Sequence, residues 1–118
     1  MFFKDPIPFL QTFKPEIQVA VQRDWWPNHF NSGFFVARSA EVTLEAFHMM
    51  YNASIYMRDD QAAFNFITHE KKNDIGIKLS ELPDNKFPCG RKYFEQPGLH
   101  WPEDVEKNTQ AFMVHNNW

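Results

Sequence analysis

The sequence has little cysteine, no long hydrophobic run and no cluster of basic residues, and each shortage excludes a class of protein. The single cysteine, Cys89, rules out an internal disulfide framework and a cysteine-rich zinc site. No stretch reaches the ~18 apolar residues of a transmembrane helix, and no basic segment before an apolar run marks a signal peptide. The 12 Lys and Arg are scattered among 15 Asp and Glu, whereas nucleic-acid binding needs a clustered cationic face. We therefore expect no membrane segment in this chain and no nucleic-acid partner.

Aromatic residues, by contrast, are abundant. The 13 Phe, 4 Trp and 3 Tyr outnumber Leu, Ile and Val taken together. Rings bury large areas, so most of them are expected in the core of a single domain over residues 1–118. Trp25 and Trp26 lie in a polar stretch, so the alternative that these rings line a carbohydrate or nucleotide site remains open.

Hydrophobic periodicity predicts an α/β fold with a mixed sheet, because predicted strands and helices interleave. Alternating or short apolar runs predict strands over residues 17–22, 33–38, 75–79 and 111–114. Helical spacing predicts a turn over 9–13, a helix over 40–52 capped by Ser39, and a helix over 59–69 capped by Asp59. The first long helix is expected to bury Ala40, Leu44, Phe47 and Tyr51, and the second to bury Ala63, Phe66 and Ile67.

Polar residues gather where predicted strands end and helices begin, which is where α/β sheets bind ligands. From spacing alone, Asn31-Ser32-Gly33 is better explained as a turn into a strand, whereas Asp59 and Asp60 are equally well explained as a helix cap and a first-turn acid. Gln61 and Asn65 add more polarity than a cap needs. The second helix is therefore also a candidate oxygen-rich face beside a substrate.

The remaining candidates for chemistry are weak when taken alone. His115 follows an apolar run, but a lone histidine without a second ligand at zinc spacing is more often structural. Cys89 lies between Pro88 and Gly90 with no activating pattern and is expected to pack in the interior. No nucleophile elbow, P-loop or dinucleotide fingerprint is present. The residues alone thus predict an α/β domain with one polar cleft.

Taken in chain order, these clusters resemble the nucleotide-diphospho-sugar transferase family, the GT-A-fold glycosyltransferases related to plant and algal family seventy-seven. They are more distantly similar to the glycogenin-like family eight enzymes. The resemblance rests on the order and spacing of stretches that span the chain. These are Phe2-Phe3-Lys4-Asp5-Pro6, Asn31-Ser32-Gly33-Phe34-Phe35, Asp59-Asp60-Gln61 with Asn65, Leu82-Pro83 with Phe87-Pro88-Cys89-Gly90-Arg91, and Val114-His115-Asn116-Asn117-Trp118. It implies a partial GT-A-type mixed sheet flanked by helices, a truncated domain lacking the N-terminal nucleotide-binding half.

The resemblance also implies roles for individual residues. Asp60 matches the catalytic acid near the anomeric carbon, where its charge would stabilise an oxocarbenium-like transition state or its oxygen would attack to form a transient glycosyl-enzyme. Asn31 and Gln61 match positions that line the sugar pocket. The expected substrate-binding residues are Asn31, Ser32, Gly33, Asp59, Gln61 and Asn65.

A divalent metal, Mn²⁺ or Mg²⁺, is implied in the same way. His115 matches the family histidine that completes the metal shell, and an imidazole beside carboxylates and diphosphate oxygens suits Mn²⁺. The family's Asp-x-Asp motif, which supplies the main ligands, would precede the stretch that ends in Asp5-Pro6, and the chain begins at Met1 without it. We therefore expect this chain alone to be inactive.

Two functions from different classes fit these expectations. The first is the C-terminal catalytic part of a metal-dependent, retaining glycosyltransferase that moves a sugar from a nucleotide-diphosphate donor to a glycan or glycoprotein acceptor. Its parent enzyme would act in the Golgi lumen, a setting with which the glycosylation sequon Asn52-Ala53-Ser54 is compatible. The alternative is a non-catalytic carbohydrate-binding or interaction module that retains only the acceptor side of the fold.

Overall fold

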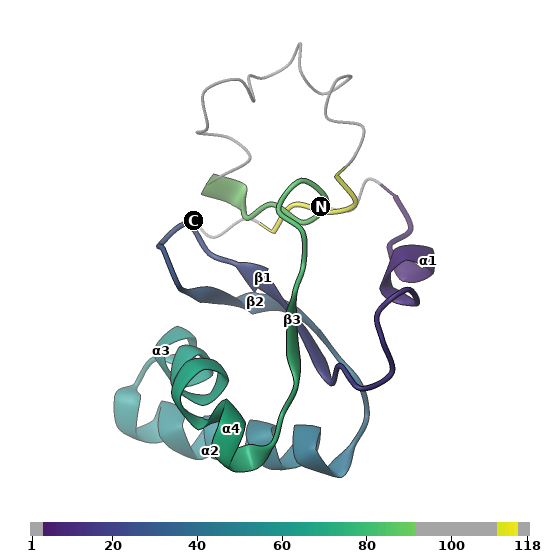
Figure 1. Cartoon of the computed structure of the whole chain (residues 1–118). Coiled ribbons are helices and arrows are strands. Elements are labelled where there is room, and N and C mark those ends of the chain that lie inside the picture. The colour runs from purple at the N-terminus through teal and green to yellow at the C-terminus, as the bar shows by residue number, and fades with distance from the viewer. Residues whose placement is uncertain (1–3, 92–110, 116–118) are drawn as a thin grey trace.

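The computed structural model describes residues 4–91 and 111–115, which form a mixed sheet covered on both faces (Figure 1). The three-stranded sheet has the order β2-β1-β3. Strand β1 (Val19–Arg23) runs antiparallel to β2 (Phe30–Ala37) and parallel to β3 (Leu79–Glu81). The predicted α/β class with a mixed sheet, of partial GT-A type, is confirmed.

Helices cover one face of the sheet. Helix α2 (Glu41–Met57) lies beneath the sheet together with α3 (Asp60–Asn65), a π-helical turn η1 (Phe66–Lys71) and α4 (Lys72–Ile75) (Figure 1). The short helix α1 (Ile7–Leu10) lies on the other side. It corresponds to the helical turn predicted over 9–13, but it begins and ends earlier in the sequence.

Strand β1 is the centre of the molecule because both of its faces are packed. Val19 and Val21 join the core on the side of α2 and α3, which includes Phe64 and Ile67. Ala20 faces the opposite core, whose members include Leu82, Phe87 and Met113, with Phe9 and Leu10 of α1 packed against them. Two covered faces explain why the first four residues of this strand are all buried, polar Gln22 included.

The buried face predicted for the first long helix is wrong. Leu44 and Tyr51 are 59% and 67% exposed, whereas the buried positions of α2 are Thr43 and Ala46. Val42, Met49 and Met50 pack beside Ala46 against the sheet. The stripe that contains Thr43 and Ala46, rather than the one that contains Leu44 and Tyr51, therefore faces the interior.

The helix boundaries also differ from the prediction. The cap residue of α2 is Ala40, which makes no side-chain cap hydrogen bond, and the helix runs past residue 52 to Met57. Asp59, as predicted, caps the next helix, because its carboxylate accepts hydrogen bonds from the backbone N–H groups of Gln61 and Ala62. That helical segment continues beyond His69 through η1 and α4 to Ile75.

Two predicted strands are changed in the structure. The strand predicted over 75–79 begins only at Leu79, because Gly76 caps α4 in a left-handed conformation with φ of +78°. The strand predicted over 111–114 is reduced to an isolated parallel bridge between Cys89 and His115. The predicted stretches at Phe2-Phe3 and near Tyr93, and Trp118, lie outside the described residues.

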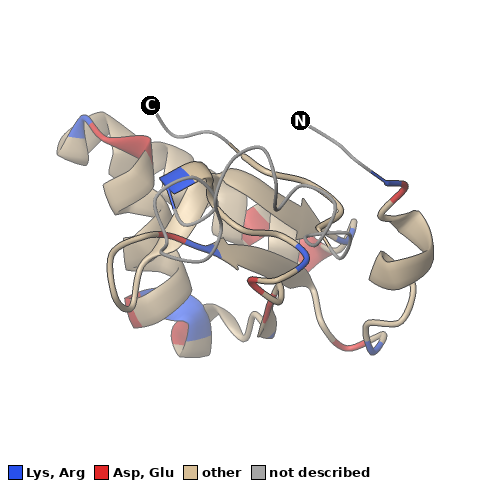
Figure 2. Ribbon diagram, turned by 90° about the horizontal axis from the view of Figure 1, so that it is seen from above, with Lys and Arg blue, Asp and Glu red and all other residues tan. Residues whose placement is uncertain are grey.

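Two further properties concern the surface. Within residues 4–91 and 111–115, no helix is both long enough and apolar enough to cross a membrane. Acidic and basic residues are scattered over the helices and loops seen in Figure 2. Two ion pairs, Arg23 with Glu81 and Lys71 with Asp74, lie at this surface.

Candidate functional site

The candidate site is built around an irregularity in strand β2. Val21 pairs with Phe35, and two residues later Arg23 pairs with Phe30, so Gln22 alone faces the longer segment 31–34. This is a β-bulge, a device that re-aims side chains and is frequent next to active sites. Asn31-Ser32-Gly33, predicted as part of the substrate site, forms the bulge.

The N-terminus of helix α3 supplies the second part of the site. Asp60 is the first residue of this helix, and its Oδ2 accepts a hydrogen bond of 2.9 Å from the Ser32 hydroxyl. The Asp60 side chain is exposed. The bulge therefore holds the carboxylate predicted to be catalytic while leaving it accessible from solvent.

Two carboxamides tie helix α3 to the same strand. Gln61 Oε1 accepts a hydrogen bond of 2.8 Å from the Ser32 N–H, and Gln61 Nε2 donates to the Phe30 carbonyl. Asn65 Oδ1 accepts from the Phe30 N–H at 2.7 Å, and Asn65 Nδ2 donates to the Phe30 carbonyl at 2.9 Å. These amides were predicted to contact substrate. Their observed partners are backbone groups, so they also position the strand that carries Ser32.

His115 supplies the third part. Its ring lies over Gly33: a Cβ placed on Gly33 would be 2.2 Å from His115 Cε1 and 2.7 Å from Nε2. The main chain of His115 is held by the bridge to Cys89 and by a 2.5 Å hydrogen bond from the Gly90 N–H to its carbonyl. The contact with Gly33 places His115 at the bulge that also binds Asp60. Cys89 itself is 1% exposed, as its predicted packing role requires.

Buried polar atoms around the bulge have unused hydrogen-bonding capacity. Asn31 is 1% exposed, and its Oδ1 accepts from the Gly33 N–H at 2.7 Å. Its Nδ2, the Nδ1 of His115 and the Oε1 of Gln22 are buried with no hydrogen-bond partner among the described residues. A buried donor or acceptor without a partner costs roughly 1–3 kcal/mol, so these atoms favour a polar ligand or water at the bulge.

The described residues do not by themselves form a metal centre. No group of three His, Cys, Asp or Glu side chains within this part of the chain is placed to hold an ion. His115 offers one nitrogen ligand, and the acidic residue at the bulge is bound to Ser32 instead. We accordingly derive no chemical step through a metal.

The family assignment comes from comparison with known proteins. The family model described as nucleotide-diphospho-sugar transferase matches residues 1–118. The chain belongs to the nucleotide-diphospho-sugar transferase family. One protein to which the chain is similar is the beta-arabinofuranosyltransferase RAY1 of Arabidopsis thaliana, 25% identical over 141 aligned residues. The alignment covers 99% of this chain and 25% of that protein, so the chain spans about a quarter of its relative's length. No solved structure matches the chain significantly.

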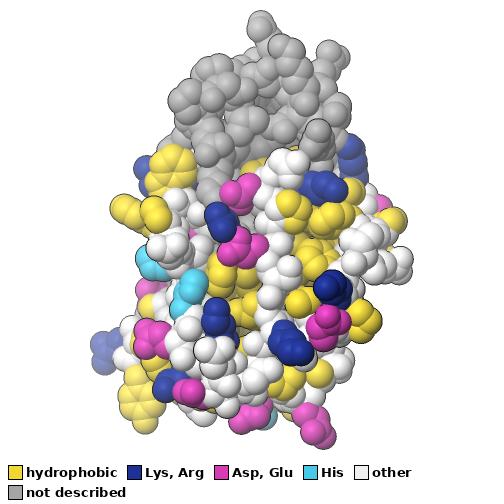
Figure 3. Space-filling view, viewed as in Figure 1, with side chains coloured by type: hydrophobic (Ala, Val, Ile, Leu, Met, Phe, Trp, Pro, Cys, Tyr) yellow, Lys and Arg dark blue, Asp and Glu magenta, His cyan; other side chains and the backbone are white. Residues whose placement is uncertain are grey.

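All the predicted site residues fall within the part of the chain that the structure describes. The bulge, the N-terminus of α3 and His115 converge, although their substrate, catalytic and metal roles stay predictions. Sequence reasoning missed Gln22, whose Nε2 donates to the carbonyls of Phe87 and Pro88 at 3.0 Å each beneath the segment that holds His115. The sequence signal that could have identified Gln22 was a glutamine within an otherwise apolar strand. Sequence reasoning also missed His69, whose ring stacks on Phe30 with centroids 4.5 Å apart. Figure 3 shows histidine side chains beside hydrophobic ones on one face of the molecule.

Proposed function

We propose that this chain is the part of a glycosyltransferase that binds the sugar of a nucleotide-diphosphate donor at the bulge and transfers it to a glycan or glycoprotein. One observation supports this most. Three segments far apart in the sequence meet at one bulge, because Ser32 donates to Asp60 and Gly33 lies under His115. Family membership supports glycosyl transfer in general, and the retaining outcome belongs to the proposal.

Asp60 is the proposed catalytic residue. As the bond from the anomeric carbon to the departing phosphate oxygen breaks, positive charge develops on the sugar, and a fixed carboxylate stabilises it. In a retaining reaction a carboxylate oxygen of Asp60 bonds transiently to the anomeric carbon as the diphosphate departs, and this bond breaks when the acceptor hydroxyl oxygen attacks the same carbon. The acceptor's proton then goes to the departing diphosphate. The Ser32 hydroxyl fixes one oxygen of Asp60 for either role.

A divalent metal, Mn²⁺ or Mg²⁺, is part of the proposal through the family resemblance. When bound, it would neutralise the charge of the diphosphate. His115 is the described side chain proposed as a ligand, and carboxylate ligands would have to come from outside the described residues.

The donor is the first question for experiment. The relative's name specifies beta-arabinofuranosyl transfer, so nucleotide-diphospho-pentoses are the donors to test before the hexoses. The intact protein is incubated with each nucleotide sugar, with Mn²⁺ and with EDTA, and release of the nucleoside diphosphate is measured. Metal-dependent release with one donor supports the proposal.

The competing function is a non-catalytic carbohydrate-binding module. It is favoured by the lack of a complete metal centre among the described residues. Saturable binding of a nucleotide sugar or glycan by the intact protein, with no turnover of any donor, would establish this alternative and overturn the proposed transfer.

A further inference from the structure

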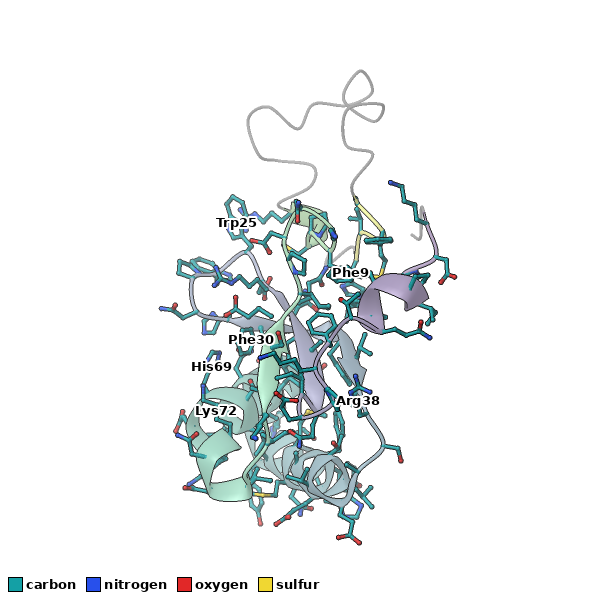
Figure 4. The ribbon with its side chains drawn as sticks, turned by 45° about the vertical axis from the view of Figure 1, so that its right-hand side comes forward. Phe9, Trp25, Phe30, Arg38, His69 and Lys72 are labelled. Carbon is teal, nitrogen blue, oxygen red and sulfur yellow. The ribbon has the colours of Figure 1, made fainter. Side chains whose placement is uncertain are left out.

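A cavity of about 140 Å³ opens beyond the end of strand β1 and is lined in part by Phe30. The loop joining β1 to β2 forms one wall, with Trp25, Trp26 and His29, and His69 of η1 contributes the other. Figure 4 shows Trp25, Phe30 and His69 along the same edge of the molecule, away from Phe9 and Arg38. Neither the transfer chemistry nor the family assignment uses these side chains.

The loop is held in one shape by its own hydrogen bonds. The Asp24 N–H donates to the His29 carbonyl at 2.9 Å, and the His29 N–H donates to the Trp26 carbonyl at 3.2 Å. The guanidinium of Arg91 lies 4.8 Å from the centre of the Trp25 ring, a cation–π contact. Trp26 is nevertheless 62% exposed. An aromatic face is thus held open to solvent by an ordered loop.

The opposite wall places a polar group beside that aromatic face. The His69 ring stacks on Phe30 with centroids 4.5 Å apart, and its Nε2 is buried with no partner among the described residues. It lies on a π-helical turn, a rare element that is frequent at functional sites. The Arg23–Glu81 ion pair also lines the cavity and adds both a donor and an acceptor.

Phe30 connects this cavity to the bulge. Its ring contacts His69 in the cavity, while its backbone is bound by Asn65 and Gln61 of α3. The next residue, Asn31, begins the bulge. A molecule in the cavity would therefore contact Phe30, the residue that precedes the bulge in strand β2.

The chemistry and size of the cavity define its ligand. Aromatic faces stack on the C–H face of a sugar ring, while imidazole, guanidinium and carboxylate groups bind its hydroxyls. A volume of about 140 Å³ is below the roughly 300–1,000 Å³ of sites for drug-sized ligands, so the cavity takes one ring rather than a long glycan. We propose that it is the acceptor subsite, which binds the terminal neutral sugar of the acceptor beside the bulge. The acceptor role rests on the proposed function, whereas carbohydrate binding does not.

The test measures binding of methyl glycosides of galactose, glucose and arabinose to the intact protein by saturation-transfer NMR. At least one glycoside is expected to bind, with saturation strongest at its ring C–H protons. Trp26→Ala should weaken that binding about tenfold, the change that corresponds to about 1.4 kcal/mol. Tyr56→Ala, which removes an aromatic ring that is 89% exposed on α2, should leave binding unchanged. His69→Phe keeps a ring on Phe30 but removes the nitrogens, so it should also weaken binding.

The outcomes separate this inference from the proposed function. If no glycoside binds, or if Trp26→Ala binds as tightly as the unaltered protein, the cavity is not a sugar site. If glycosides bind through Trp26 but no donor is turned over, the acceptor role fails together with the proposed transfer. If a donor is turned over and Trp26→Ala leaves the acceptor KM unchanged, only the present inference is overturned.

Discussion

Replacing Gly33 with alanine tests whether the bulge and His115 form one unit. The new Cβ would lie 2.2 Å from His115 Cε1 and 2.7 Å from Nε2, whereas carbon atoms in contact are about 3.5–4.0 Å apart. The imidazole must therefore move by more than about 1 Å. The main chain of His115 is bound to Gly90 and Cys89, so the ring has to rotate, because the backbone cannot move away with it.

We expect Gly33→Ala to lower the free energy of unfolding by about 1–3 kcal/mol, the usual cost of inserting a methylene-sized group into a packed site. The backbone adds nothing to this cost, because Gly33 is not among the described residues with positive φ. In a His115→Ala background the space is vacated, and the nearest remaining atom is Asn31 Oδ1 at 3.1 Å. There the same substitution should cost less than about 0.5 kcal/mol, because alanine also loses less backbone entropy than glycine on folding.

Urea unfolding of the four proteins in this double-mutant cycle gives the coupling energy directly. A coupling of at least about 1 kcal/mol between the two positions supports the contact. Equal costs of Gly33→Ala in both backgrounds, or no cost in either, would show that the His115 ring does not lie on the bulge.

Three further expectations follow from individual side chains. Asp59→Ala should cost about 0.5–2 kcal/mol in urea unfolding through loss of the α3 cap, while Asp59→Asn, whose oxygen also caps, should cost far less. Burial, followed by the charge of Lys72, lowers the pKa of His69. Since the unfolded chain then takes up the proton first, the free energy of unfolding should fall as the pH drops below about 6.5, and His69→Gln should flatten that fall. His115→Ala should weaken Mn²⁺ binding to the intact protein, measured by calorimetry, by about 10–100-fold, and an unchanged affinity would remove His115 from the proposed metal shell.

Local signals in the sequence predicted local structure well. Asp59 was expected to cap a helix because a carboxylate just before the free N–H groups of a helix is sufficient for that interaction. In the structure, Asp59 caps α3. The alternation of Val19 and Val21 with Ala20 correctly indicated a strand with two different faces. Neither inference depends on contacts with distant parts of the chain.

Choices that depend on distant contacts were not predictable. Helix α2 carries apolar residues on more than one side. Its packing against distant parts of the chain determines that Ala46 rather than Leu44 faces inward. The bulge in β2 depends on Gln61 and Asn65, which bind the backbone of Phe30 and Ser32 from a helix some 30 residues away. The predicted site residues do lie together at the bulge, but their functional roles stay predictions, and their arrangement depends on the folded structure.

The central claim, that the bulge presents Asp60 to a sugar donor, is tested most directly by Asp60→Asn in the intact protein with its preferred nucleotide sugar. Asparagine can still accept the hydrogen bond from Ser32, so the substitution removes charge and keeps the contact. Asp74→Asn is the matched control, because that carboxylate is exposed and pairs only with Lys71 at the surface in the described part of the chain. We predict that kcat falls about 10²–10³-fold in Asp60→Asn, with donor Kd changed by less than about threefold. An unchanged kcat, or an equal loss in both variants, would contradict the account.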